Sequence, residues 1–185
     1  MERGIENYLR FLRGDSSAMR SIVEMFWDTM LLFTNGYVHN ISDAEDIAQE
    51  ALIELAVRKP RLEEEHQLKA YLYRICRNKS INHLKKYQRM TGLSPEAETF
   101  LEDESAEIES RMEMKESAKL LHRTMQKLPQ NYREILYLRY FGDLSMKETA
   151  RVMRMTEKQA TAVAYQARQQ LRKLLEKEGY SGEDL

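Results

Sequence analysis

Residues that interrupt helices are scarce in this chain. Only seven Gly and three Pro occur among its 185 residues, which leaves few positions for tight turns. No segment alternates apolar and polar residues with the two-residue period of a half-buried strand, and no internal repeat is evident. The sequence therefore predicts an all-α protein of long helices, with the length of one ordinary domain or two small ones.

Capping signals mark where several of these helices begin. Asp15 can cap the first predicted helix, and Pro129 suits the first turn of a later one. The segments S-D-A-E from Ser42, S-M-K-E from Ser145 and T-E-K-Q from Thr156 match a capping box, in which two side chains satisfy backbone donors reciprocally. The predicted helices cover about residues 15–38, 43–59, 68–89, 129–141, 146–153 and 156–178, and another begins near residue 105.

The clearest break in the chain is the segment T-G-L-S-P at 91–95. It separates a helical domain of residues 1–90 from an acidic linker of residues 91–118, which is followed by a smaller helical domain of residues 119–178 and a tail of residues 179–185. The second domain contains a short helix at 146–153, a turn at 154–156 and a longer helix, with the small residue Ala150 between the helices. This spacing predicts a helix-turn-helix unit.

The net charge of −1 conceals an uneven distribution of charge. Seven basic residues and no acid lie within 69–89, and seven bases against two acids lie within 151–177. The segment between them, 94–118, holds nine acids and two bases. We therefore expect two surfaces that bind a polyanion, one on each domain.

The last predicted helix has two distinct faces at 100° per residue. Its core face holds Ala160, Val163, Ala164, Ala167, Leu171 and Leu174. The opposite face mixes cations, amides, a hydroxyl and a ring, and consists of Lys158, Thr161, Ala162, Tyr165, Arg168, Gln169 and Arg172. Such side chains suit phosphates and base edges in a major groove. In an isolated helix this face is more often solvated surface, but the helix-turn-helix spacing favours DNA binding.

The basic helix at 69–89 carries a second candidate surface. One narrow arc of this helix contains Tyr71, Arg74, Asn78, Asn82 and Lys85. Cations interleaved with Tyr and Asn suit single-stranded nucleic acid, where bases stack and phosphates are neutralised. The alternative is a solvated stripe, although seven like charges on one helix repel each other.

The helix at 43–59 is acidic on its exposed side. It carries Asp43, Glu45, Asp46, Gln49, Glu50 and Glu54 around an apolar stripe. This combination suits a basic protein partner, although such a face alone is more often ordinary surface.

Catalytic and metal-binding signals are lacking. The four His have no ligand spacing with one another or with Cys76, and no phosphate loop, nucleophile elbow or HExxH motif occurs. We therefore expect a protein that is not an enzyme and needs no metal or cofactor, with Cys76 as a small buried residue. No apolar run is long enough for a membrane span or typical of a signal peptide, which predicts no membrane insertion and a cytoplasmic location.

Four segments together resemble the extracytoplasmic-function (ECF) sigma factors of bacterial RNA polymerase, the small two-domain members of the sigma-70 family. They are DAEDIAQEALIEL at 43–55, AYLYRICRNKSINHLKK at 70–86, LPQNYREILYLRYFGDLSMKETARVM at 128–153 and TEKQATAVAYQARQQLRKLL at 156–175. The resemblance implies a sigma factor that binds core polymerase, recognises the minus-35 and minus-10 promoter elements and promotes strand opening. Residues 1–90 would be sigma region 2 and residues 119–178 sigma region 4. Family members are often held by an anti-sigma factor, which is therefore a candidate partner.

The resemblance also implies residue roles. The contact with the polymerase clamp helices corresponds to Asp46, Ile47, Gln49 and Glu50, with Ile47 and Leu52 packed behind. Minus-10 reading and melting correspond to Tyr71, Arg74, Arg77, Asn78, Lys79 and Asn82. Minus-35 recognition corresponds to Lys158, Gln159, Thr161, Ala162, Tyr165 and Arg168. The polymerase β-flap contact corresponds to Tyr137, Leu138, Tyr140 and Phe141, and the loop 60–68 takes the place where family members trap a flipped base.

This sequence departs from the family pattern at three places. Tyr71 replaces a common Trp, which reduces the stacking area. Arg154 replaces a turn Gly, which predicts backbone strain. Three consecutive acids, 63–65, lie in the base-trapping loop and should repel phosphate.

Two rival functions also fit parts of the pattern. One is a two-domain helix-turn-helix transcriptional regulator with an N-terminal sensor domain, which would not need the basic helix at 69–89. The other is a helical protein-interaction adaptor, which would show no salt-dependent DNA binding.

Overall fold

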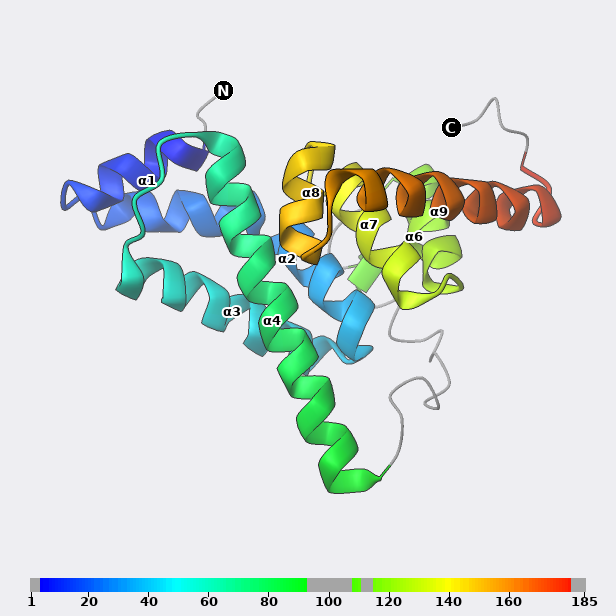
Figure 1. The fold of residues 1–185 in the computed structure, drawn as a ribbon. Helices are drawn as coiled ribbons and strands as arrows, with labels where there is room; N and C mark the ends of the chain where they lie inside the picture. Colours follow the sequence, from blue (N-terminus) through cyan, green and yellow to red (C-terminus); the bar gives the residue numbers. More distant parts are fainter. Residues whose placement is uncertain (1–3, 93–107, 111–114, 181–185) are drawn as a thin grey trace. The chain divides into compact units, whose positions relative to one another are not determined.

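The computed structural model describes residues 4–92, 108–110 and 115–180, and every regular element within these ranges is a helix (Figure 1). The predicted all-α class is therefore confirmed. The chain divides into two compact units, Met1–Thr99 and Phe100–Leu185. Most of the predicted linker, the helix start near residue 105 and the end of the tail lie outside the described residues. The functional boundaries at residues 90 and 119 stay predictions.

The first unit is a bundle of four helices: α1 (Gly4–Leu12), α2 (Ser17–Val38), α3 (Ile41–Arg58) and α4 (Glu65–Thr91). The helix α2 packs against each of the other three and supplies the centre of the core. Phe33 on α2 is buried and meets the Tyr73 ring of α4 edge-on, with ring centroids 5.2 Å apart. Such an aromatic pair adds directionality to the apolar burial that holds the bundle together.

Three predicted details of this unit differ from the structure. The helix α1 was not predicted. The helix α3 begins at Ile41, because the side chain of Asn40 caps it by accepting from the Asp43 N–H at 3.0 Å, so the predicted Ser42 capping box is wrong. Asn is as good a cap as Ser, and this start also buries Ile41. The helix α4 begins at Glu65, which is three residues earlier than predicted.

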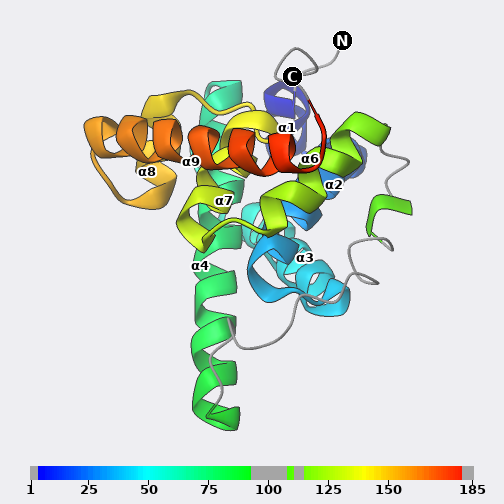
Figure 2. The same ribbon diagram turned by 90° about the vertical axis from the view of Figure 1, so that its right-hand side faces the viewer.

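The second unit contains α6 (Glu116–Gln126), α7 (Gln130–Tyr140), α8 (Met146–Met153) and α9 (Glu157–Lys177), preceded by a single helical turn at 108–110. The helix α9 packs on both α7 and α8 (Figure 2). The capping boxes at Ser145 and Thr156 are both present, as predicted. Pro129 lies one residue earlier than predicted, at the N-cap position of α7.

The turn between α8 and α9 completes the predicted helix-turn-helix unit. Arg154 ends α8 with φ = 57°, in the left-handed region, and the Met155 N–H donates to the Ala150 carbonyl at 3.0 Å. The strain predicted from Arg154 in place of Gly is therefore confirmed in the backbone angle. Ala150 is 97% buried, which is consistent with its predicted place between two closely packed helices.

Candidate nucleic-acid and protein-binding surfaces

The helix α9 presents one polar face to solvent and packs the other into the unit. The buried positions are Ala160, Ala164, Ala167, Leu171 and Leu175. All of the residues predicted to read the minus-35 element are exposed, namely Lys158, Gln159, Thr161, Ala162, Tyr165 and Arg168. We call these six residues the α9 face. Small alanines on the buried side let α9 lie close to α7 and α8, which turns the larger side chains outward.

Two members of the α9 face also form hydrogen bonds within the helix. Gln159 Oε1 accepts from the backbone N–H of Thr156 at 2.8 Å as part of the capping box. The Thr161 hydroxyl donates to the Glu157 carbonyl at 2.8 Å. Because these polar atoms already have partners, the charged ends and the ring of the α9 face are its main groups for contacting a ligand.

The predicted minus-10 residues lie along α4, but they differ in exposure. Arg74 and Asn82 are exposed, whereas Tyr71 is half-buried. The Arg74 guanidinium lies over the Tyr71 ring, 5.3 Å from its centroid, which is a cation–π arrangement. Burial, followed by the charge of Glu54, raises the pKa of Tyr71. Tyr71 therefore keeps its phenol proton at neutral pH and offers a ring already stacked on one cation.

Three other residues of that prediction, Arg77, Asn78 and Lys79, are half-buried. Lys79 Nζ lies 2.8 Å from Glu50 Oε2 and 3.7 Å from Glu54 Oε2, both on α3. The hydrogen bond that Lys79 donates to Glu50 raises the pKa of Lys79, so the ammonium stays charged. In this structure the charged end of Lys79 therefore pairs with α3, which the sequence alone did not indicate.

The acidic side of α3 contains the residues predicted to bind polymerase. Asp46, Gln49 and Glu50 are exposed. Ile47 and Leu52 are each only 5% exposed, so they pack behind this surface, as predicted, and Ile47 itself has little area left for direct contact. We call Asp46, Gln49 and Glu50 the α3 face.

Two apolar residues beside the α3 face were missed from the sequence. Ile53 is 53% exposed and Val57 is 75% exposed. Their signal was present, because Gln49, Ile53 and Val57 follow one another at four-residue spacing and therefore share a side of the helix. These two side chains add exposed apolar area next to the α3 face.

The three consecutive acids at 63–65 form ion pairs or hydrogen bonds within the unit. Each has a partner within the unit: Glu63 pairs with Arg61 at 2.9 Å, Glu64 with His66 at 3.0 Å, and Glu65 accepts from the Ile5 N–H at 2.8 Å. These partners offset part of the repulsion toward phosphate that three consecutive acids suggested.

The predicted β-flap residues separate into buried and exposed members. Tyr137 and Leu138 belong to the core, with at most 1% of their surface exposed, so these two predicted contacts are wrong for this structure. Tyr140 is 52% exposed and Phe141 is half-buried. The cause is the helical period, because α7 packs against α9 and turns only part of its aromatic run outward.

Tyr137 belongs to a buried polar cluster. Gln126 Nε2 donates to the Tyr137 hydroxyl oxygen at 2.9 Å, and that oxygen lies 2.6 Å from His122 Nδ1. Which of the two groups donates in the contact between Tyr137 and His122 depends on the tautomer of the His122 ring. Burial lowers the pKa of His122 to about 4, so the ring is neutral at neutral pH.

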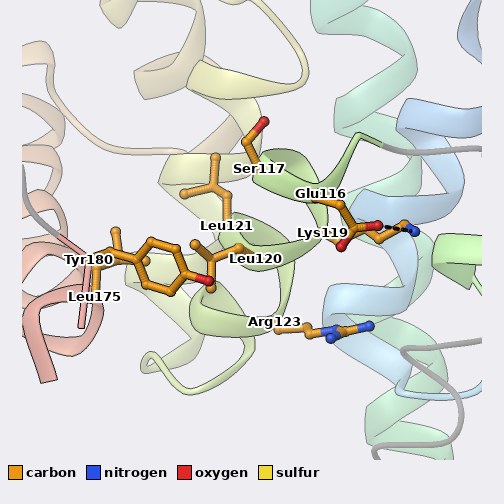
Figure 3. A pocket seen from close by; sticks show the side chains of 8 residues that line it. All are labelled: Glu116, Ser117, Lys119, Leu120, Leu121, Arg123, Leu175 and Tyr180. Atoms are coloured by element: carbon orange, nitrogen blue, oxygen red, sulfur yellow. Dashed lines mark hydrogen bonds and ion pairs between the residues drawn. The ribbon is translucent and has the colours of Figure 1, made fainter. Parts of the chain in front are cut away.

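A groove of about 520 Å³ lies between α6 and the end of α9 (Figure 3). Leu120, Leu175 and Tyr180 supply apolar lining, while Lys119 forms an ion pair with Glu116 at 2.7 Å on the rim. No local pattern in the sequence indicates this groove, because Leu120 and Leu175 on its two sides are 55 positions apart in the chain.

Side chains that could bind a metal are dispersed over the part of the chain that the structure describes. No group of three or more His, Cys, Asp or Glu side chains gathers there as a metal site. Cys76 is fully buried, as predicted, and burial raises its pKa to about 12. Among the described residues, no helix combines the length and the apolar character that crossing a membrane requires.

Comparison with known proteins agrees with this arrangement. Residues 31–90 match the family model Sigma-70 region 2, and residues 118–171 match Sigma-70, region 4. The chain is 30% identical to the RNA polymerase sigma-H factor of Pseudomonas aeruginosa over 175 residues, which cover 90% of this chain and 91% of that protein. It is 26% identical to the ECF RNA polymerase sigma factor SigW of Bacillus subtilis, over 88% of this chain and 91% of that protein.

Solved structures show the same fold. CnrH, described in complex with the cytosolic domain of CnrY, superposes with a TM-score of 0.63 at 18% identity, over 92% of this chain and 95% of that chain. The sigma factor RpoE of Bartonella quintana, described with the anti-sigma factor NepR, has a TM-score of 0.63 at 17% identity, over 85% of this chain and 96% of that chain. With both sigma regions matched in order along the chain, this protein belongs to the ECF sigma factors of the sigma-70 family.

Proposed function

We propose that this chain directs core RNA polymerase to promoters, with the α3 face bound to the clamp helices, α4 engaged with the minus-10 element and the α9 face in the major groove of the minus-35 element. The observation that carries the proposal is that α9 has one buried apolar side and one exposed polar side. All six predicted DNA-reading residues are exposed, while the alanines between them are buried. A recognition helix requires this arrangement, because only outward side chains can reach base edges.

The α9 face supports major-groove reading by its chemistry. Lys158 and Arg168 supply cations for phosphates or for guanine edges, and Tyr165 is 59% exposed beside them. Each good bidentate contact to a base supplies about 1–3 kcal/mol of discrimination. Phosphate contacts would set the register of the helix on the duplex.

The minus-10 role of α4 rests on the Tyr71–Arg74 stack. Strand opening requires bases to be unstacked, at a cost of a few kcal/mol for each flipped base. Stacking on an aromatic ring stabilises an exposed base by about 1–3 kcal/mol, and a cation beside the ring attracts the phosphate. The half-buried Tyr71 and the exposed Arg74 combine both on one side of α4. The loop at 60–64 would hold a flipped base.

The polymerase contact of α3 combines charge with apolar area. Asp46, Gln49 and Glu50 supply acidic and polar groups, and Ile53 and Val57 extend the surface by apolar side chains. An interface of this kind gains orientation from charge and affinity from apolar burial. Tyr140 and Phe141 are the members of the predicted β-flap contact that remain accessible.

Several broader properties follow from a role in initiation. A sigma factor performs no covalent chemistry, so we expect no enzymatic activity, metal or cofactor. Its partners are core polymerase and promoter DNA, which place it in the cytoplasm. An anti-sigma factor is a candidate partner, because the structural relative RpoE of Bartonella quintana is described in complex with one.

The direct test is transcription with purified core polymerase and the full chain. Promoters selected from a randomised library should give initiation at defined start sites only when the chain is present. Asp46→Arg, which reverses charge on the α3 face, is the control and should abolish initiation without unfolding the protein. Salt-dependent DNA binding without any initiation would favour the regulator with an N-terminal sensor domain, and no DNA binding would favour the adaptor.

A further inference from the structure

The helix α1 contacts the two ends of the loop between α3 and α4. The Tyr8 hydroxyl donates to the Pro60 carbonyl at 2.6 Å, at the start of the loop. Glu65 Oε2 accepts from the Ile5 N–H at 2.8 Å, at its end. These contacts join residues 52 and 60 positions apart, so they hold the loop from outside rather than through its own turns.

The Tyr8 contact is built into the core. Its side chain has no exposed surface, and its hydroxyl reaches the Pro60 carbonyl from the buried side of α1. Burial, with a smaller contribution from Tyr71, raises the pKa of Tyr8 to about 12, so its proton remains available for this hydrogen bond. A buried donor with one acceptor favours one position of the carbonyl, because any other leaves the buried Tyr8 hydroxyl without a partner.

The Glu65 contact fixes the other end of the loop. The first N–H groups of a helix have no partner within the helix, and a carboxylate at that end also meets the positive end of the helix dipole. Glu65 therefore faces α1, and its charge is not directed at DNA. Gly4 allows this approach, since a Cβ at that position would lie 2.6 Å from the Phe26 ring and 3.0 Å from Glu65 Oε1.

A third contact lies just before the loop. The Lys59 ammonium is 5.3 Å from the centroid of the Phe11 ring. Lys59 ends α3 with φ = 46°, so the chain turns sharply there into Pro60. Ile5, Tyr8 and Phe11 follow at three-residue spacing, and one side of α1 therefore spans the whole loop.

We propose that α1 is a positioning element for the 60–64 loop, and that Tyr8 and Glu65 set the pose in which the loop holds a flipped promoter base. This inference rests on the proposed function, because it assigns the loop a base to hold. Neither residue touches DNA, and both act through the Pro60 carbonyl and the start of α4. Their loss should therefore alter which base is preferred at one or two positions, and leave recognition by α9 intact.

The test compares base preferences of reconstituted holoenzymes on a randomised promoter library. Tyr8→Phe removes only the hydroxyl. We expect the ratio of the preferred base to the other bases to fall at least fivefold at one or two minus-10 positions. The minus-35 base preferences, the affinity for polymerase and the thermal unfolding temperature should stay close to those of the unaltered protein. Tyr132→Phe is the matched control, because it removes a Tyr hydroxyl that donates to Gln166 Oε1 at 2.7 Å in the other unit.

A second pair of variants distinguishes loss of the contact from a general folding defect. Glu65→Gln keeps an oxygen that can accept from the Ile5 N–H and should retain the preference, whereas Glu65→Ala should lose it at the same positions as Tyr8→Phe. A uniform loss at all promoter positions, or an unchanged profile in Tyr8→Phe and Glu65→Ala, overturns the inference. If the unaltered holoenzyme shows no base preference at all, the proposed function fails together with it.

Discussion

Lys79 on α4 donates a hydrogen bond to Glu50 on α3, with 2.8 Å between Nζ and Oε2. The pair joins a residue predicted to bind DNA to one predicted to bind polymerase. Lys79 is also 3.7 Å from Glu54, and His83 on the same helix lies 3.2 Å from Asp43. The two candidate surfaces are therefore electrostatically linked along the α3–α4 contact.

This link predicts different salt effects for two cations of α4. The affinity for forked promoter DNA falls as the salt concentration rises. Arg74→Ala should make the slope of log affinity against log salt concentration less steep by about 0.7–0.9, because one phosphate contact is lost. Lys79→Ala should leave that slope nearly unchanged, because its charge is paired with Glu50. Equal slopes for Arg74→Ala and Lys79→Ala, measured with holoenzyme, would show that Lys79 leaves Glu50 to contact DNA.

A second prediction concerns Arg168 on the α9 face. Arg168→Ala should lower the affinity of the holoenzyme for promoter duplex about 5- to 150-fold, equivalent to about 1–3 kcal/mol, and leave polymerase binding intact. Lys177→Ala is a suitable control, since it removes a cation from the same helix about 13 Å further along the axis. Loss of polymerase binding in Arg168→Ala would contradict the assignment of this face.

The exposed Ile53 predicts an apolar contribution to polymerase binding. Ile53→Ser should weaken the complex with core polymerase about three- to tenfold, which corresponds to burying roughly half of an Ile side chain. The thermal stability of the free protein should change little, because Ile53 is 53% exposed. Met90→Ser, at an exposed apolar residue on α4, provides the comparison. Equal effects of the two substitutions would argue against a contact at Ile53.

The strained turn predicts a stabilising substitution. Arg154 has φ = 57°, which costs a residue with a Cβ about 1–2 kcal/mol. Arg154→Gly should raise the free energy of unfolding by about 0.5–1 kcal/mol relative to Arg154→Ala, after the greater freedom of Gly in the unfolded chain is subtracted. Urea unfolding of these two variants isolates the backbone effect, since both lack the Arg side chain. No difference between them would show that the turn relaxes at little cost.

The buried His122 predicts a loss of stability in mild acid. Its pKa is lowered from 6.5 to about 4 by burial, so between these values the unfolded chain binds a proton that the folded chain does not. The free energy of unfolding should therefore fall as the pH drops from 6.5 to 4, by about 2–3 kcal/mol. Chemical denaturation of the full chain at several pH values measures this change. His122→Gln cannot take up the proton and should lack this part of the pH dependence; an unchanged profile would contradict the prediction.

Local patterns predicted much of the fold correctly, and also the exposure of the residues on the α9 face. The boxes at Ser145 and Thr156 are short-range hydrogen-bond patterns, and the two faces of α9 follow from the helical period alone. The Ser42 box failed because Asn40, two residues earlier, offers an equally good cap that also buries Ile41. Where two local signals compete, burial of an apolar residue decides between them.

Helix periodicity, capping chemistry and the segregation of charge along the chain were determined by the sequence itself, because each depends on residues within one or two turns. The tertiary structure alone decided that Lys79 faces Glu50, that Tyr137 is buried and that Tyr8 holds the Pro60 carbonyl. The partners in the Lys79 and Tyr8 contacts are 29 and 52 residues apart in the chain. Which side chains meet over such separations depends on how whole helices pack, and no local period specifies that.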